Sequence, residues 1–86
     1  KAGVVGLTLH LASYWASKKI RVNTLSPGGI FSGQNKTFVD NYSKRIPLGR
    51  MAKKEEMIGA ILYLSSDASS YVTGQNIFVD GGLSSW

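Results

Sequence analysis

The sequence predicts an α/β fold built on a parallel sheet, and three features of the chain indicate it. Two stretches with apolar residues at helical spacing alternate with two short stretches rich in β-branched residues. The order is helix, strand, long loop, helix, strand, and two strands joined through a helix imply a parallel, right-handed βαβ unit. The first strand also runs directly into Pro27-Gly28-Gly29, and ligands of open α/β sheets bind at the carboxyl ends of the strands.

The first helix is expected over residues 2–17, where apolar residues occupy two stripes of a helical surface. Val4, Leu7 and Leu11 belong to one stripe, and Val5 and Leu9 belong to the other. A helix that is apolar around most of its circumference must be covered on two sides. We expect a sheet on one side and a neighbouring helix or a second subunit on the other.

The first strand is expected to begin near Ile20, because β-branched residues favour an extended backbone. Pro27 has no N–H for a strand ladder, so the strand should stop there. Gly28 and Gly29 then allow backbone angles that other residues avoid. This pattern predicts bare backbone at the carboxyl end of the strand.

The remaining elements follow from shorter patterns. Residues 31–53 form a long polar connection, which in a compact unit is usually a lid or another functional loop, and residues 35–42 within it are expected to contain a short helix. A second helix is expected over residues 54–65, with Glu55 and Glu56 in its first turn, where negative charge is favourable. A second strand is expected over residues 76–80.

Composition bounds the class of protein. The chain has 86 residues, enough for one domain, and starts with Lys1 instead of Met, so we expect it to be part of a larger protein. A formal charge of +5 raises the alternative of a nucleic-acid binder, but the basic residues are scattered along the sequence and do not form one cluster. Besides Lys1, they are Lys18, Lys19, Arg21, Lys36, Lys44, Arg45, Arg50, Lys53 and Lys54.

Several other function classes are disfavoured by what the sequence contains. It has no cysteine, which excludes disulfides and thiolate metal sites and is compatible with a cytoplasmic protein. The single histidine, His10, has no second metal ligand near it in the sequence, so no metal site is expected. No apolar run approaches the ~20 residues that a membrane-spanning helix needs.

Four segments of the chain together resemble the C-terminal portion of a short-chain dehydrogenase/reductase. They occur in the family's order and at its usual spacing, and they cover almost the whole length. The segments are Lys1-Ala2-Gly3-Val4-Val5-Gly6-Leu7-Thr8, Ile20-Arg21-Val22-Asn23 with Pro27-Gly28, Ile46-Pro47-Leu48-Gly49-Arg50, and Tyr71-Val72-Thr73-Gly74-Gln75 through Val79-Asp80-Gly81-Gly82. The resemblance implies the C-terminal part of a Rossmann-like, doubly wound parallel sheet, spanning residues 1–86 of a single domain.

The resemblance implies a catalytic role for Lys1. In this family a tyrosine four residues before the lysine is the general acid/base, and the lysine contacts the nicotinamide ribose and lowers the pKa of the tyrosine. A nearby ammonium group favours the phenolate. The tyrosine would precede the first residue of this chain.

A second pair, Tyr14 and Lys18, has the same Tyr-x-x-x-Lys spacing. We prefer Lys1, because the family separates its catalytic lysine from the Arg-Val-Asn strand by a long helix, and only Lys1 has that separation. Lys18 would also lie at the wrong end of the helix for a site above the carboxyl ends of the strands. Tyr14 is then a packing residue, and Lys18 is a cation at a helix end.

The resemblance also assigns the ligand-binding positions. Pro27, Gly28, Ile30 and Ser32 match positions that line the nicotinamide of NAD or NADP, and the backbone of Ile30 is expected to bond the carboxamide. Residues 31–53 become the substrate lid. The substrate is expected to contact Gly29, Phe31, Phe38 and Tyr42, although core packing is an equal alternative for Phe38 and Tyr42.

The expected function is the C-terminal part of an NAD(P)-dependent oxidoreductase that interconverts a carbonyl and an alcohol. The 86-residue chain alone should be inactive, because the phosphate-binding turn and the tyrosine would precede it. The substrate is a small molecule, with sugar derivatives among the candidates, and the protein is expected to be a cytoplasmic homo-oligomer, a dimer or tetramer. The alternative is an inert, truncated chain that serves only as an oligomerisation or interaction surface.

Overall fold

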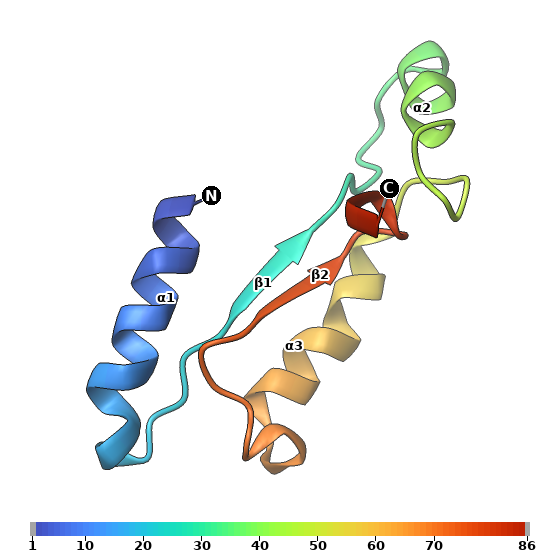
Figure 1. Ribbon diagram of the computed structural model, residues 1–86. Helices are drawn as coiled ribbons and strands as arrows, with labels where there is room; N and C mark the ends of the chain where they lie inside the picture. Colours follow the sequence, from blue (N-terminus) through green and yellow to red (C-terminus); the bar gives the residue numbers. More distant parts are fainter. Residues whose placement is uncertain (1, 86) are drawn as a thin grey trace.

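The computed structural model of the chain describes residues 2–85, and its element order matches the predicted one (Figure 1). The helices are α1 (Ala2–Trp15), α2 (Lys36–Ser43) and α3 (Ile58–Ser65), and the strands are β1 (Thr24–Pro27) and β2 (Asn76–Val79). Short 3₁₀ segments continue or precede these elements at Ala16–Lys18, Lys54–Met57, Asp67–Ser69 and Leu83–Ser85.

The two strands pair in parallel, which confirms the predicted topology. Thr24 lies opposite Asn76, and Pro27 lies opposite Val79. Because side chains alternate along a strand, Thr24 and Val79 point to opposite faces. The Thr24 hydroxyl bonds Thr8 of α1, while Val79 shares a cavity with Met57 just before α3. The helices α1 and α3 therefore flank the strand pair on opposite faces (Figure 1).

The first strand starts later than predicted but ends at the predicted proline. It starts at Thr24 instead of near Ile20, because the backbone of Val22 bonds the Thr73 hydroxyl and the turn residue Gly74 and not a strand ladder. It also includes Pro27. The N–H groups of Thr24 and Gly28 donate to the carbonyl groups of Gln75 and Val79. Because backbone groups alternate along a strand, the Pro27 nitrogen faces away from β2. Proline is tolerated where no ladder donor is needed.

The helices largely confirm the predicted ranges. α1 is followed by one 3₁₀ turn, and the helix expected over residues 54–65 begins with a 3₁₀ turn at Lys54–Met57 before α3. The short helix predicted within the lid is α2. Among the described helices, none is long and apolar enough to cross a membrane.

The apolar core of the described chain is small. It consists of Ala12, Ile46, Met51 and Met57, each with less than a tenth of its surface exposed. By contrast, Val4 and Leu7 of α1 and Leu62 of α3 are more than half exposed. Within residues 2–85, α1 is thus covered on one side only, and the second cover that we predicted for it is not among these residues. Apolar helix faces of this size are normally buried against further protein.

The amino ends of the strands are fastened together by side chains. The Arg21 guanidinium donates hydrogen bonds to Ser69 Oγ (2.8 Å) and to three backbone carbonyl oxygens, those of Leu64 (3.0 Å), Val72 (3.1 Å) and Ser66 (3.2 Å). A cation at the end of α3 also suits the negative pole of the helix dipole. The Asn23 side chain bonds two backbone groups of the segment before β2: it donates to the Val72 carbonyl and accepts from the Gln75 N–H. This end of the sheet is therefore fixed by residues next to the strands.

Candidate functional site

The carboxyl end of β1 comes so close to neighbouring residues that only glycine fits there. A Cβ atom on Gly28 would lie 2.8 Å from the Cα of Asp80, and one on Gly29 would lie 2.5 Å from the Cε1 of Tyr42. Real Cβ atoms do not approach other heavy atoms this closely. The Gly28-Gly29 pair is thus a close-packing feature as well as a strand-ending turn.

The carboxyl end of β2 uses glycine in the same way. Gly81 and Gly82 have φ angles of +66° and +92°, in the left-handed region that favours glycine. A Cβ on Gly81 would lie 2.7 Å from Cγ2 of Ile46, and one on Gly82 would lie 3.1 Å from the Pro47 ring. The Leu48 N–H also donates to the Gly81 carbonyl at 3.0 Å. The predicted lid is therefore seated directly on the end of β2.

Helix α2 places an aromatic pair beside the strand end. Its N-cap residue, Asn35, accepts a hydrogen bond from the Phe38 N–H at 2.9 Å, which fixes the start of the helix. Phe38 and Tyr42 lie one turn apart and stack with ring centroids 5.8 Å apart. The Tyr42 ring covers Gly29. Of the residues predicted to contact substrate, Gly29 and Tyr42 are in contact with each other, and Phe38 stacks on the Tyr42 ring.

Two hollows meet the segment that follows β1. One, of about 380 Å³, contains four of the predicted residues, and the other, of about 470 Å³, contains three. The first is lined by Ser26, Pro27, Gly28, Gly29, Tyr42, Phe78, Asp80, Leu83 and Ser84. The second is lined by Ile30, Phe31, Ser32, Gly33, Lys53, Lys54 and Glu55.

The structure therefore divides the predicted site into two parts. Phe31 and Tyr42, both expected to contact the substrate, line different hollows, and Phe31 lies with Ile30 and Ser32. The sequence interpretation did not include Asp80, Leu83 and Ser84 at the first hollow. A signal for them existed, because parallel strands end at the same edge and the residues after β2 must lie beside those after β1.

Asp80 organises the turn after β2. One carboxylate oxygen accepts from the Gly82 N–H at 3.0 Å, and the other accepts from the Ser84 N–H at 3.1 Å. These bonds, with one from the Ser84 side chain as the largest contribution, lower the pKa of Asp80. A carboxylate held in this way is ionised at neutral pH and is a poor general base. Its role in the described residues is to shape the turn.

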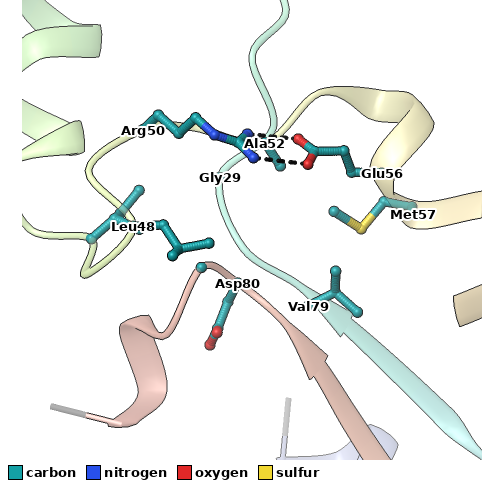
Figure 2. Close-up of a pocket in the computed structure, with 10 residues that line it drawn as sticks. Gly29, Leu48, Arg50, Ala52, Glu56, Met57, Val79 and Asp80 are labelled. Carbon is teal, nitrogen blue, oxygen red and sulfur yellow. Dashed lines mark hydrogen bonds and ion pairs between the residues drawn. The ribbon is translucent and has the colours of Figure 1, made fainter. Parts of the chain in front are cut away.

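A smaller cavity of about 140 Å³ lies between the lid and the strand ends (Figure 2). On one side of it Arg50 and Glu56 form a two-pronged ion pair, with Nη1–Oε1 and Nη2–Oε2 distances of 2.7 and 2.9 Å. The Lys53 N–H also donates to Glu56 at 2.9 Å. The Arg50 hydrogen bond, followed by that of Lys53, lowers the pKa of Glu56 to about 2. This pair holds the end of the lid to the turn before α3.

The competing tyrosine–lysine pair lies far from this site. Lys18 follows α1 and is next to the amino ends of the strands, whereas α1 begins near their carboxyl ends (Figure 1). Tyr14 is 66% exposed and stacks on His10. Lys1, the preferred candidate, lies outside the described residues. Its neighbour Ala2 lines a hollow together with Pro27 and Ser26.

The part of the chain that the structure describes contains no group of three His, Cys, Asp or Glu residues that could hold a metal ion. The chemistry available at the strand ends is instead that of backbone N–H and C=O groups, hydroxyls of serine and tyrosine, two lysines, and the carboxylates of Asp80 and Glu55. Such a set can bind a polar organic molecule through hydrogen bonds.

Comparison with known proteins agrees with this fold. Residues 1–84 match the family model described as enoyl-(acyl carrier protein) reductase. D-arabinitol 2-dehydrogenase (ribulose-forming) of Candida tropicalis is 47% identical over all of this chain and 33% of its own length. A 3-oxoacyl-[acyl-carrier-protein] reductase of Thermotoga maritima is also 47% identical, over 96% of this chain and 35% of its own.

Solved structures give the same result. A short-chain dehydrogenase of Leptospira borgpetersenii with bound NAD+ superposes with a TM-score of 0.91 at 48% identity, over 95% of this chain and 32% of the other. A gluconate 5-dehydrogenase of Burkholderia cenocepacia, in complex with NADP and tartrate, has a TM-score of 0.93 at 38% identity, over 100% of this chain and 36% of the other.

Fold and matches together define the class: the chain corresponds to the carboxyl-terminal portion of a Rossmann-fold domain. The chain belongs to the short-chain dehydrogenase/reductase family, as its motifs predict. It spans about a third of the length of the curated relatives that it matches.

Proposed function

We propose that the chain is the C-terminal third of an NAD(P)-dependent oxidoreductase that interconverts a carbonyl and an alcohol, with residues 31–53 as its substrate lid. The observation that carries this proposal is the carboxyl edge of the parallel strands. There, glycine removes side chains from the backbone and the lid packs directly above. The relatives that match the whole chain are dehydrogenases and reductases.

The residues at this edge fit a nicotinamide cofactor by their donor set. The Ile30 carbonyl and the Ser32 N–H and hydroxyl offer acceptor and donor groups of the kind that a carboxamide requires. Pro27 and Gly28 present no long side chain to block an approaching ring. When bound, the cofactor supplies the hydride acceptor or donor. The protein residues orient the ring and exclude water from it.

Lys1 is proposed as the partner of a tyrosine in the segment that precedes it in the family's motif. Its ammonium group would favour the phenolate form of that tyrosine and bring its pKa, normally about 10, closer to neutral pH. The tyrosine could then accept or donate the hydroxyl proton of the substrate. Lys1 would also hold the ribose of the cofactor.

The substrate proposed for the site is a polyhydroxylated alcohol or its carbonyl form. Relatives are named for arabinitol, xylulose and gluconate. In this chain the hollow beside Gly29 carries the hydroxyls of Tyr42 and Ser84, which can bond substrate hydroxyl groups. Phe38 would act through Tyr42, on which it stacks. Phe31 would contact the part of the substrate nearest Ile30 and Ser32.

The test uses the full-length protein, meaning the native polypeptide that contains this chain. It should bind NAD+ or NADP+ with saturation and reduce it in the presence of at least one pentitol or sugar acid. The isolated 86-residue chain should do neither. Absence of cofactor binding by the full-length protein would contradict the proposal.

A second candidate function is an inert chain that acts only as an assembly surface, and the exposed apolar faces of α1 and α3 favour it. Intact mass distinguishes the two. A native polypeptide near 9.3 kDa supports the second candidate, whereas one about three times as long agrees with the length of the relatives. Under the first candidate, these faces are covered by the rest of the domain and by a second subunit of a cytoplasmic homo-oligomer.

A further inference from the structure

The side-chain amide of Gln34 folds back onto the segment that follows β1. Its Oε1 accepts a hydrogen bond from the Ser32 N–H at 2.8 Å, and its Nε2 donates to the Ile30 carbonyl at 3.3 Å. One primary carboxamide thus bridges a backbone donor and a backbone acceptor two residues apart. These two groups are in the same segment that we propose for the cofactor.

The other edge of this segment is already used. The Gly29 carbonyl accepts from the Ala52 N–H at 2.9 Å, and the Phe31 N–H donates to the Ala52 carbonyl at 2.8 Å, which makes a parallel bridge. The Ile30 carbonyl and the Ser32 N–H are bonded to Gln34 and not to Ala52. A carbonyl at one residue and an N–H two residues later are the pair that a parallel partner would bond.

Gln34 therefore takes the place of a missing partner on that edge. Its amide oxygen substitutes for a partner carbonyl, and its amide nitrogen substitutes for a partner N–H. The fit shows that this edge is complementary to a primary carboxamide. Nicotinamide is also a primary carboxamide, so the cofactor would need the two groups that Gln34 occupies.

We propose that Gln34 is an internal competitor for the nicotinamide carboxamide and sets the affinity of the protein for its cofactor. The inference rests on the proposed function. Cofactor binding replaces the two hydrogen bonds of Gln34 with its own and releases the glutamine side chain. Because Gln34 directly precedes the N-cap of α2, Asn35, its release occurs at the point where the lid helix begins.

The test compares two ligands on the full-length protein. Gln34→Met keeps the length of the side chain but removes both hydrogen-bonding atoms of the amide, and Gln34→Ala is a second variant. Each should lower the Kd for NAD+ by about two- to tenfold, the factor that one net hydrogen bond represents. The Kd for ADP-ribose, which lacks the nicotinamide, should not change. If the wild type prefers NADP+, the pair is NADP+ and 2′-phospho-ADP-ribose.

Gln75→Ala is the matched control. Its amide also donates to a backbone carbonyl at 3.3 Å, that of Thr73, but at the amino end of the strands, so neither Kd should change. An unchanged or higher Kd for NAD+ in both Gln34 variants would overturn the inference and leave the proposed function intact. Equal shifts for both ligands would also overturn it, because a general effect on the loop would then explain them. A wild type that binds neither ligand would overturn the proposed function, and the inference with it.

Discussion

The two ends of the strand pair are built on opposite principles. At the amino end, long polar side chains do the fastening, with Arg21 alone donating four hydrogen bonds and Asn23 bonding the backbone on both sides. At the carboxyl end, glycines stand where side chains would block close approach. Gly28, Gly29 and Gly81 allow other residues to come within van der Waals contact of the backbone.

This difference matches what each end must do. Directional hydrogen bonds to a guanidinium hold a fixed geometry and need no further partner. Close packing over glycine gives a seat for the lid, and the backbone groups of Ile30 and Ser32 that we propose for a ligand are held by a displaceable side chain, that of Gln34. The amino end should therefore control stability, and the carboxyl end should control binding. Four predictions on the full-length protein test this division, from the largest expected effect to the smallest.

Arg21→Ala should have the largest effect on stability. It removes four hydrogen bonds and leaves carbonyl groups without a donor, so we expect the free energy of unfolding to fall by about 2–4 kcal/mol. Arg21→Lys should recover only part of this, since an ammonium group cannot reach all four acceptors. Urea unfolding measures both variants. The exposed Arg45→Ala is the control, and an equal loss there would argue against a special role for Arg21.

Gly29→Ala should move the lid. The new methyl group would collide with the Tyr42 ring, and we expect a loss of about 1–3 kcal/mol in stability together with a higher KM for the substrate. Combining it with Tyr42→Ala removes the collision, so the two changes should couple by about 1 kcal/mol or more in a double-mutant cycle. Strict additivity of the two would show that this contact carries no energy.

Asn35→Ala should loosen α2 alone. The variant loses the N-cap bond to the Phe38 N–H, which typically stabilises a helix by about 1 kcal/mol. Amide hydrogen exchange should speed up within Lys36–Ser43 and stay unchanged at the amino ends of the strands. The control is Asn41→Ala, on the exposed surface of the same helix. If exchange rose equally at both ends of the sheet, the division between the two ends would be wrong.

The Arg50–Glu56 pair should give the smallest effect, and it depends on pH. The pKa of Glu56 is lowered from 4.5 to about 2 in the folded protein, so the unfolded chain binds the proton first. The contribution of the pair is present above pH 4.5 and decreases as the pH falls toward about 2. The pair is largely exposed to solvent, so the change in melting temperature should be modest.

Glu56→Gln should remove this component of the pH dependence. Melting temperatures of the wild type and the variant should differ at neutral pH and converge in acid. Glu55→Gln removes the same charge one residue away and serves as the control. A constant difference between wild type and Glu56→Gln at every pH would contradict the proposed origin of the effect.

Local patterns in the sequence were enough to predict the order of elements and the parallel pairing. Apolar spacing indicated α1 and α3, and Pro27-Gly28-Gly29 indicated the end of β1. The start of β1 was placed too early, because Arg21 and Asn23 are held to the segment before the second strand through side-chain bonds and not through a ladder. Sequence periodicity cannot distinguish these two ways of holding an extended backbone.

The contacts that shape the site were not predictable from the same patterns. The need for glycine at position 29 comes from Tyr42, which lies on another element. The separation of Phe31 from Tyr42 depends on how the lid turns after Ile30. Such contacts depend on the packing of the lid as a whole, and no spacing of residue types encodes them.

The distance along the chain between the paired strands has a consequence for biosynthesis. Asn23 bonds Gln75, which is 52 residues further on. During translation β1 leaves the ribosome before β2 does, so its edge remains without this partner while the lid and α3 emerge. An unpaired strand edge can join other chains. We expect chaperones that bind nascent polypeptides to engage the region around Thr24–Pro27 during that interval.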